Sequence, residues 1–435
     1  MRYIVVIGGG FAGTSAVRRL ERRLPAGWQV TLLSEENYMT YTPLLPEVVG
    51  ASLAPSHAVA PLRTMLRGAA YRRAAVQAID FAGRTLRYGP GAEHFLHYEH
   101  LVLACGSVPN LGFIDGMDRH ALPLKTLGDA LHIRNRVILA LERAELEDDA
   151  RLRDRLTTFI VIGGGSSGVE VAGAIADFLR AAQRYYPRLR ETRAKVIVIE
   201  SGDRLLSEFP GTLGDSALRS MRGHGIDIRL DTVAATVSDR GVKTEAGDWI
   251  EGGNIICTIG TEPNALIRSL ALPKEKGRLK TGPDMSVTGQ QGVWAIGDCA
   301  VVINADTGEC SPPTAQFAVR QGRQVADNIV RELEDKPVRA FSYRSRGELA
   351  TIGHRRAVAQ LFGLRLSGFT AWLIWRAVYL FMLPTALRKL QVFSEWSLEL
   401  LFPRDMTQLH FGRTRSECAV GEQQGDPDMN RAVSR

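Results

Sequence analysis

Two copies of one short pattern constrain the fold of this 435-residue chain more than any other feature. Residues 3–13 read YIVVIGGGFAG and residues 158–168 read TFIVIGGGSSG, and apolar residues at helical spacing follow each copy. A strand, a G-x-G-x-x-G turn and a helix begin a dinucleotide-binding unit, because the glycines allow a pyrophosphate to approach the helix N-terminus closely. One copy is weak evidence, but two copies in the same context predict an α/β protein with two Rossmann-like domains.

The two loops predict which residues contact the nucleotides. These are Gly8, Gly10, Phe11, Ala12 and Gly13 in the first copy, and Gly163, Gly165, Ser166 and Gly168 in the second. A second strand should end in an acid for the ribose hydroxyls about 20 residues later. Glu200 meets this expectation and favours NADH over NADPH, because a carboxylate repels a 2′-phosphate. In the first copy Ser34 holds that position, so Glu35 is the candidate, with a solvated turn as the alternative.

Composition and charge narrow the choice of class. The five cysteines include no C-x-x-C pair, which argues against a disulfide scaffold, a zinc ribbon or a thioredoxin-type centre, and no metal site is expected. The net charge of +7 is local: residues 337–415 hold 12 of the 54 basic and 4 of the 47 acidic residues, so that segment carries +8 and the remainder −1. The basic segment lacks a recognised nucleic-acid module, so no nucleic-acid partner is expected.

The basic segment is also rich in apolar residues. Arg365 and Arg376 interrupt the apolar run 361–384, which disfavours a transmembrane helix. Trp372, Trp375, Tyr379 and Met382 recur at three- to four-residue spacing, and a second apolar stretch covers residues 392–402. These patterns predict interfacial helices on an anionic lipid surface, with a buried core or dimerisation pair as the alternative. The polar residues 416–435 are expected to form a disordered tail.

With Ala104-Cys105-Gly106-Ser107 and Ile296-Gly297-Asp298 added to the loops, the sequence resembles the two-dinucleotide-binding flavoproteins. That resemblance implies FAD at the first loop, NADH at the second, and Asp298 at the ribityl chain of FAD. Four stretches further resemble type II NADH dehydrogenase, the single-subunit NADH:quinone oxidoreductase. They are residues 37–46, residues 101–109 with 121–126, residues 163–170 and residues 313–322. The absence of a closely spaced cysteine pair near the flavin argues against disulfide reductases.

The resemblance assigns further site residues. It implies Glu170 near the nicotinamide and flavin, where an acid that complements the helix dipole is the alternative. It implies Gln316 and Arg320 at the quinone head group, although the family usually has a second Gln at the position of Arg320, which leaves the acceptor open. The remaining cofactor-binding residues expected are Asn37, Thr42, Pro43, Val76, Ala104, Gly106, Gly260 and Ala315.

The expected architecture has an FAD-binding domain (residues 1–113 and 284–337), an NADH-binding domain (114–283) and a C-terminal membrane-associating α-helical region (338–415). The expected reaction passes a hydride from NADH to FAD and two electrons to a membrane quinone, without proton pumping. The protein would be peripheral on the cytoplasmic side of the inner (cell) membrane, and a homodimer is possible. Alternatives are an FAD-dependent NAD(P)H reductase using a ferredoxin or a specialised quinone, and a flavin-bound redox sensor.

Overall fold

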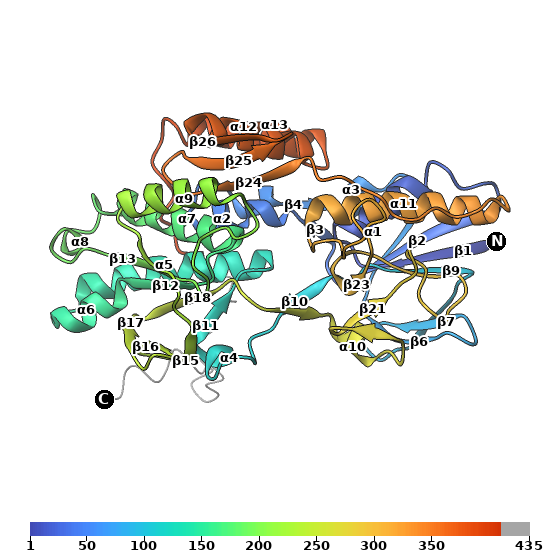
Figure 1. Ribbon diagram of the computed structural model, residues 1–435, viewed down its shortest axis with the longest axis horizontal. Coiled ribbons are helices and arrows are strands. Elements are labelled where there is room, and N and C mark those ends of the chain that lie inside the picture. The colour runs from blue at the N-terminus through green and yellow to red at the C-terminus, as the bar shows by residue number, and fades with distance from the viewer. Residues whose placement is uncertain (410–435) are drawn as a thin grey trace, which may run out of the picture.

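The computed structural model describes residues 1–409, so the tail predicted for residues 416–435 lies outside the described part of the chain. Two lobes lie side by side, and a smaller C-terminal unit lies above them in Figure 1. Each lobe is built on a five-stranded parallel sheet, which agrees with the predicted α/β class. The apolar runs of both glycine motifs form central strands, because strands of such sheets are buried on both faces.

The first lobe holds the sheet with strand order β22-β9-β1-β2-β5. Helix α1 follows β1 directly and packs against the long helix α11. The elements of this lobe are β1 (Arg2–Ile7), α1 (Phe11–Leu20), β2 (Trp28–Ser34), β3 (Tyr38–Thr40), β4 (Val59–Pro61), α3 (Leu62–Met65), β5 (Ala70–Arg73), β6 (Val76–Asp80), β7 (Thr85–Tyr88), β8 (His94–His97), β9 (His100–Leu103), α10 (Ala265–Ser269), β20 (Lys274–Glu275), β21 (Arg278–Lys280), β22 (Val293–Ala295), β23 (Ala300–Val301) and α11 (Ala315–Leu333). Helix α2 (Leu45–Val49) comes from the same part of the chain but packs against helices of the second lobe.

The second lobe repeats the arrangement, with strand order β11-β18-β12-β13-β14. Its β12–α7–β13 unit corresponds to β1–α1–β2 of the first lobe. The elements are α4 (Met117–His120), β11 (Ala121–Pro123), α5 (Leu127–Leu146), α6 (Ala150–Leu156), β12 (Thr158–Ile162), α7 (Ser166–Ala182), α8 (Arg188–Glu191), β13 (Lys195–Ile199), α9 (Gly211–Gly223), β14 (Asp227–Arg229), β15 (Ala234–Ser238), β16 (Gly241–Thr244), β17 (Trp249–Glu251) and β18 (Asn254–Cys257). The antiparallel pair β10 (Ser107–Pro109) and β19 (Thr261–Pro263) connects the lobes.

The C-terminal unit corrects one expectation. Helices α12 (Phe369–Met382) and α13 (Ala386–Leu398) are present, but residues 361–368, which were expected in the first helix, belong to an antiparallel sheet. Its strands are β24 (Gly347–Thr351), β25 (Ala357–Leu361) and β26 (Leu364–Gly368). Phe362 and Gly363 form a two-residue hairpin turn with φ of 51° and 86°. Two positive φ values in a row are typical of the type I′ turns that join adjacent strands.

The aromatic stripe of α12 also lies on a different surface from the one expected. Trp372, Trp375 and Trp396 are 6%, 1% and 4% exposed, so they pack against the protein and not at an interface. Other apolar side chains of the unit are exposed instead: Phe369, Leu373, Phe381, Met382, Leu387, Leu390 and Phe393. Among residues 1–409, no helix is both long and apolar enough to cross a membrane.

Candidate active site

The first glycine loop has the shape that a dinucleotide needs. A Cβ at Gly13 would lie 1.9 Å from the carbonyl oxygen of Gly8, and Gly8 itself has φ +110°. A Cβ at Gly10 would meet nothing within 4 Å, so open space faces the beginning of α1. That helix has no side-chain cap and no acid in its first turn. Its free amides therefore fit the pyrophosphate of FAD.

The second loop has the same backbone shape but is already in contact with two carboxylates. A Cβ at Gly168 would lie 1.8 Å from the Gly163 carbonyl oxygen. The Glu200 carboxylate accepts a hydrogen bond from the Gly164 amide at 2.6 Å. Glu208, which the sequence did not single out, accepts hydrogen bonds from the amide and the hydroxyl of Ser166 at 2.9 and 2.6 Å. A nucleotide phosphate at the α7 N-terminus would take the place of Glu208, since both are anions that fit the same amides.

Several other predicted residues gather at the end of β9. The Asp298 carboxylate accepts hydrogen bonds from the Ser107 hydroxyl at 2.9 Å and the Lys125 ammonium at 3.4 Å. Ala104 is buried, and Gly106 has φ +67°. Burial raises the pKa of the Cys105 thiol well above its usual range. A raised thiol pKa lowers the reactivity of a cysteine, because the thiolate is the reactive form.

The remaining predicted cofactor contacts lie apart from this group. Glu35 and Asn37 are exposed just after β2, and Val76 begins β6 in a separate antiparallel sheet. Gly260 lies beside Asn110 and Phe113 with φ +73°. The role assigned to each of these residues stays a prediction.

One cavity of about 1300 Å³ brings most of the expected reaction centre together. It is lined by residues from both glycine-loop lobes and from α12, although these segments are far apart in the sequence. The predicted residues on its wall are Phe11, Thr42, Pro43, Gly165, Ser166, Gly168, Glu170, Ala315, Gln316 and Arg320. The arrangement can hold two ring systems and an acceptor in one cavity, as stacked redox partners require.

Gln316 and Arg320 lie on α11 and differ in what they can offer a ligand. The Gln316 side chain donates from Nε2 to the Gly347 carbonyl at 2.9 Å and accepts from the Tyr343 hydroxyl at 3.0 Å. Its amide therefore connects α11 to the C-terminal unit. The Arg320 guanidinium lies 5.1 Å from the centroid of the Tyr343 ring, and Arg320 lines the cavity.

Glu170 lies in the second turn of α7 and is 8% exposed. Its carboxylate oxygen accepts the Thr351 amide proton at 3.1 Å. Burial raises the pKa of Glu170 to about 8, although the Thr351 amide acts in the opposite direction. Burial therefore favours the protonated carboxyl group over a wider pH range than at an exposed glutamate.

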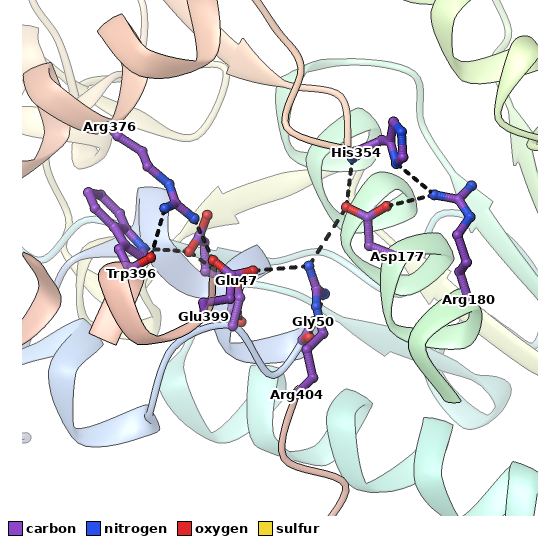
Figure 2. Close-up of polar contacts among 10 residues, drawn as sticks. Glu47, Gly50, Asp177, Arg180, His354, Arg376, Trp396, Glu399 and Arg404 are labelled. Carbon is purple, nitrogen blue, oxygen red and sulfur yellow. Dashed lines mark hydrogen bonds and ion pairs between the residues drawn. The ribbon is translucent and has the colours of Figure 1, made fainter. Parts of the chain in front are cut away.

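A second cavity of about 440 Å³ lies behind Glu170, which lines both cavities. Figure 2 shows the polar network on its wall. Arg404 bridges Glu399 at 3.2 Å and Asp177 at 3.8 Å. Glu399 also pairs with Arg376, and Glu47 accepts a hydrogen bond from the Trp396 indole at 2.7 Å. This network connects the C-terminal unit to α2 and α7.

Sequence reasoning assigned no cavity role to several residues that line the large cavity. They are Arg18, Lys125, Glu208, Arg323, Tyr343, Glu348 and Tyr379. The Tyr379 ring makes an edge contact with Tyr41, with 6.3 Å between the ring centroids. The spacing of Tyr379 with Trp372 and Trp375 marked one helix face, but spacing alone could not assign that face to the protein interior. Within residues 1–409, no group of three His, Cys, Asp or Glu side chains could hold a metal ion.

Comparison with known proteins agrees with this arrangement. Residues 2–322 match the family model of the pyridine nucleotide-disulphide oxidoreductases, and residues 345–405 match the NDH2 C-terminal domain. The type II NADH:quinone oxidoreductase Ndh of Mycobacterium tuberculosis is 30% identical over 95% of this chain and 92% of its own length. The demethylphylloquinone reductase NdbB of Synechocystis is 30% identical over 90% of this chain and 95% of its own length.

Solved structures show the same fold. NDH2 from Plasmodium falciparum in complex with NADH superposes with a TM-score of 0.87 at 20% identity, covering 93% of this chain and 99% of the other. The sulfide:quinone oxidoreductase of Aquifex aeolicus has a TM-score of 0.68 at 18% identity, covering 94% and 96%. Both glycine loops, the shared cavity and the matched C-terminal domain lead to one conclusion: the chain belongs to the type II NADH:quinone oxidoreductases of the pyridine nucleotide-disulphide oxidoreductase family.

Proposed function

We propose that this protein oxidises NADH through bound FAD and passes two electrons to a quinone, in the reaction NADH + H⁺ + quinone → NAD⁺ + quinol. The observation that carries the proposal is the cavity of about 1300 Å³, whose wall includes both glycine-loop lobes and α12. Bound FAD supplies a hydride acceptor that also donates electron pairs. The printed names of the relatives, which include quinone oxidoreductases and a demethylphylloquinone reductase, support a quinone as acceptor.

The chain itself binds and orients the reactants. The amides of α1 and α7 hold the two pyrophosphates, Asp298 holds the ribityl chain, and Glu200 holds the NADH ribose. Three domains would divide this work: residues 1–113 with 284–337 for FAD, residues 114–283 for NADH, and residues 338–415 for the membrane. Arg320 donates to the acceptor oxygen, because a guanidinium offers several N–H donors in a fixed geometry. Gln316 keeps the wall around that oxygen in place.

Glu170 holds a proton at its carboxyl group when the site is at neutral pH. Its pKa, raised to about 8, supports a role as proton donor within the cavity. A Glu170→Gln variant keeps the shape and loses the exchangeable proton. Quinone reduction should therefore slow by about 10²-fold. FAD content should stay the same.

The exposed apolar residues of α12 and α13 would place the protein on a lipid surface. Phe381, Leu390 and Phe393 are 74%, 64% and 57% exposed, with Arg388 and Lys389 beside them on α13. Amphipathic helices with this composition lie in the headgroup region of anionic membranes. Serine at these three apolar positions should release the protein from vesicles, and continued binding would refute this part of the proposal. The proposal also places the protein on the cytoplasmic face of the membrane, as a homodimer.

The test of the reaction is an anaerobic titration of the purified, FAD-loaded protein with NADH, followed by quinone, with the flavin absorbance recorded. Stoichiometric bleaching by NADH and full recovery with quinone are expected. If NADH bleaches the flavin and a ferredoxin restores the absorbance but no quinone does, the acceptor is a ferredoxin and not a quinone. If NADH causes no bleaching, the protein is not an NADH-oxidising enzyme, and the result would favour a flavin-bound redox sensor.

A further inference from the structure

One carboxylate occupies donors that the proposed reaction assigns to a substrate. Glu208 accepts hydrogen bonds from the backbone amide and the hydroxyl of Ser166, at 2.9 and 2.6 Å, and Ser166 is the first residue of α7. Helix α7 itself has no side-chain cap and no acid in its first turn. The role proposed above for α7 gives the same donors to the pyrophosphate of NADH. Glu208 and the dinucleotide therefore compete for them.

The backbone that carries Glu208 is fixed to the same glycine loop. The Leu206 amide donates to the Gly164 carbonyl at 2.9 Å, and the Phe209 amide donates to the Leu206 carbonyl at 2.8 Å. Leu205, Leu206 and Phe209 are buried. Leu206 has φ +53°, a left-handed conformation that surrounding contacts must hold in a residue other than glycine. The Glu208 side chain is exposed, so it can leave the loop while its backbone stays in place.

Two other carboxyl groups decide where a displaced Glu208 side chain can go. Glu208 lines the large cavity together with Glu170 and Glu348. Burial raises the pKa of Glu170 and of Glu348, and the negative charge of Glu208 raises both pKa values further. Movement deeper into the cavity would bring like charges together, at a cost in free energy. The direction towards solvent has no such cost.

We propose that Glu208 is a built-in competitor for the dinucleotide. It binds the Ser166 amide and hydroxyl when the NADH site is empty, and the pyrophosphate of NADH or NAD⁺ must replace it. This role rests on the proposed function, which supplies the identity of the ligand. The competitor acts on the empty site alone, so it raises the KM for NADH and weakens product inhibition by NAD⁺, and it leaves the chemical step unchanged. Glu208 thereby sets the NADH concentration at which the enzyme saturates.

The size of the effect follows from the fraction of empty sites that Glu208 occupies. A competitor that is bound for about nine tenths of the time weakens the apparent affinity for the ligand about tenfold. Two hydrogen bonds to an ionised acceptor, each weakened by exposure to water, have the strength that gives such an occupancy. The association rate constant of the ligand falls by the same factor, because only the unoccupied sites can bind. The dissociation rate constant stays the same.

Two substitutions separate competition from charge. Glu208→Ala removes the carboxylate. Glu208→Asp keeps the charge on a side chain that is one methylene shorter, and the fixed backbone holds it too far from Ser166 for the same hydrogen bonds. The control is Asp215→Asn, which removes one negative charge at an exposed position on α9. Binding of ADP-ribose to the FAD-loaded proteins is followed by stopped-flow fluorescence. Adenosine, which lacks the pyrophosphate, is tested as an inhibitor of NADH oxidation.

Both Glu208 variants should bind ADP-ribose about tenfold more tightly than the wild type, through faster association. Their kcat/KM for NADH should rise by about the same factor while kcat stays the same. Adenosine should inhibit all the proteins equally, and the control should behave as the wild type does. Without ligand, both Glu208 variants should melt at a lower temperature than the wild type, because Ser166 loses a partner. Saturating ADP-ribose should remove that difference.

Several results would overturn the proposal. If Glu208→Asp binds ADP-ribose as the wild type does and only Glu208→Ala binds more tightly, charge and not contact is responsible. Tighter binding that comes only from slower dissociation would show that Glu208 repels the bound ligand. Weaker binding in both variants would show that Glu208 helps to hold it, and a melting difference that persists at saturation would show a purely structural role.

The same measurements keep this proposal apart from the proposed function. If the wild type binds ADP-ribose but reduces no quinone, the proposed function fails, while the two variants still decide the role of Glu208. If the wild type reduces quinone and neither variant gains affinity, the competitor is wrong and the proposed function stands. If ADP-ribose binds to none of the proteins, both proposals are wrong.

Discussion

Replacing Glu170 by Gln should change how the stability of this protein depends on pH. Burial raises the pKa of Glu170 to about 8 in the folded protein, from a usual value of 4.5. Between these values the folded chain holds one proton more than the unfolded chain. Stability from this group is therefore fully present below pH 4.5 and is lost as pH rises towards 8. Gln keeps an oxygen that can accept the Thr351 amide proton, but it does not titrate.

The size of the effect follows from the two pKa values. One pKa unit corresponds to about 1.4 kcal/mol, and titration in the unfolded state has already begun at pH 5. The difference in unfolding free energy between the wild type and Glu170→Gln should therefore shift by about 3 to 4 kcal/mol from pH 5 to pH 8, in favour of the variant. Water that reaches the cavity reduces this value.

The assay is urea unfolding of the FAD-loaded proteins at several pH values across this window. Glu245→Gln at an exposed position is the matched control, and its stability should follow that of the wild type at every pH. Parallel curves for the wild type and Glu170→Gln would refute the reasoning, since they would show that Glu170 ionises as readily in the folded as in the unfolded chain. If the wild type instead became more stable relative to the variant as pH rises, the predicted effect would have the wrong sign.

Other changes test the loops and the C-terminal unit. Gly13→Ala should abolish FAD binding, seen as loss of the flavin absorbance, because the added Cβ meets the Gly8 carbonyl. Gly168→Ala should retain FAD and raise the KM for NADH roughly 10- to 100-fold, because its Cβ meets the Gly163 carbonyl. The reverse pattern would contradict the assignment of the loops. Glu200→Gln should reduce the preference for NADH over NADPH roughly tenfold in kcat/KM, and an unchanged ratio would exclude the ribose role. Arg376→Met should lower the unfolding free energy by about 2 kcal/mol in urea, because it leaves Glu399, whose side chain is only 17% exposed, with Arg404 as its remaining partner. A loss below about 1 kcal/mol would show that the pair is dispensable.

Features set by neighbouring residues could be predicted from the sequence. The β-branched runs, the glycine triplets and the helical spacing after them identified both nucleotide loops, and the structure forms a strand, turn and helix at each. The required backbone shape is local, because Gly13 packs on Gly8 five residues away and Gly168 packs on Gly163 in the same way. The basic charge of the C-terminal segment could likewise be counted directly.

Only the tertiary structure decided which surfaces face one another. Helical spacing marked the tryptophan face of α12 as apolar, but both protein and bilayer can cover such a face, and packing assigned it to the protein. The position of Glu170 between two cavities depends on Thr351 and Glu47, which lie 181 residues after it and 123 residues before it. Burial is a property of such long-range contacts, so it shifts the pKa of a residue such as Glu170 in a way that the neighbouring residues in the sequence do not determine.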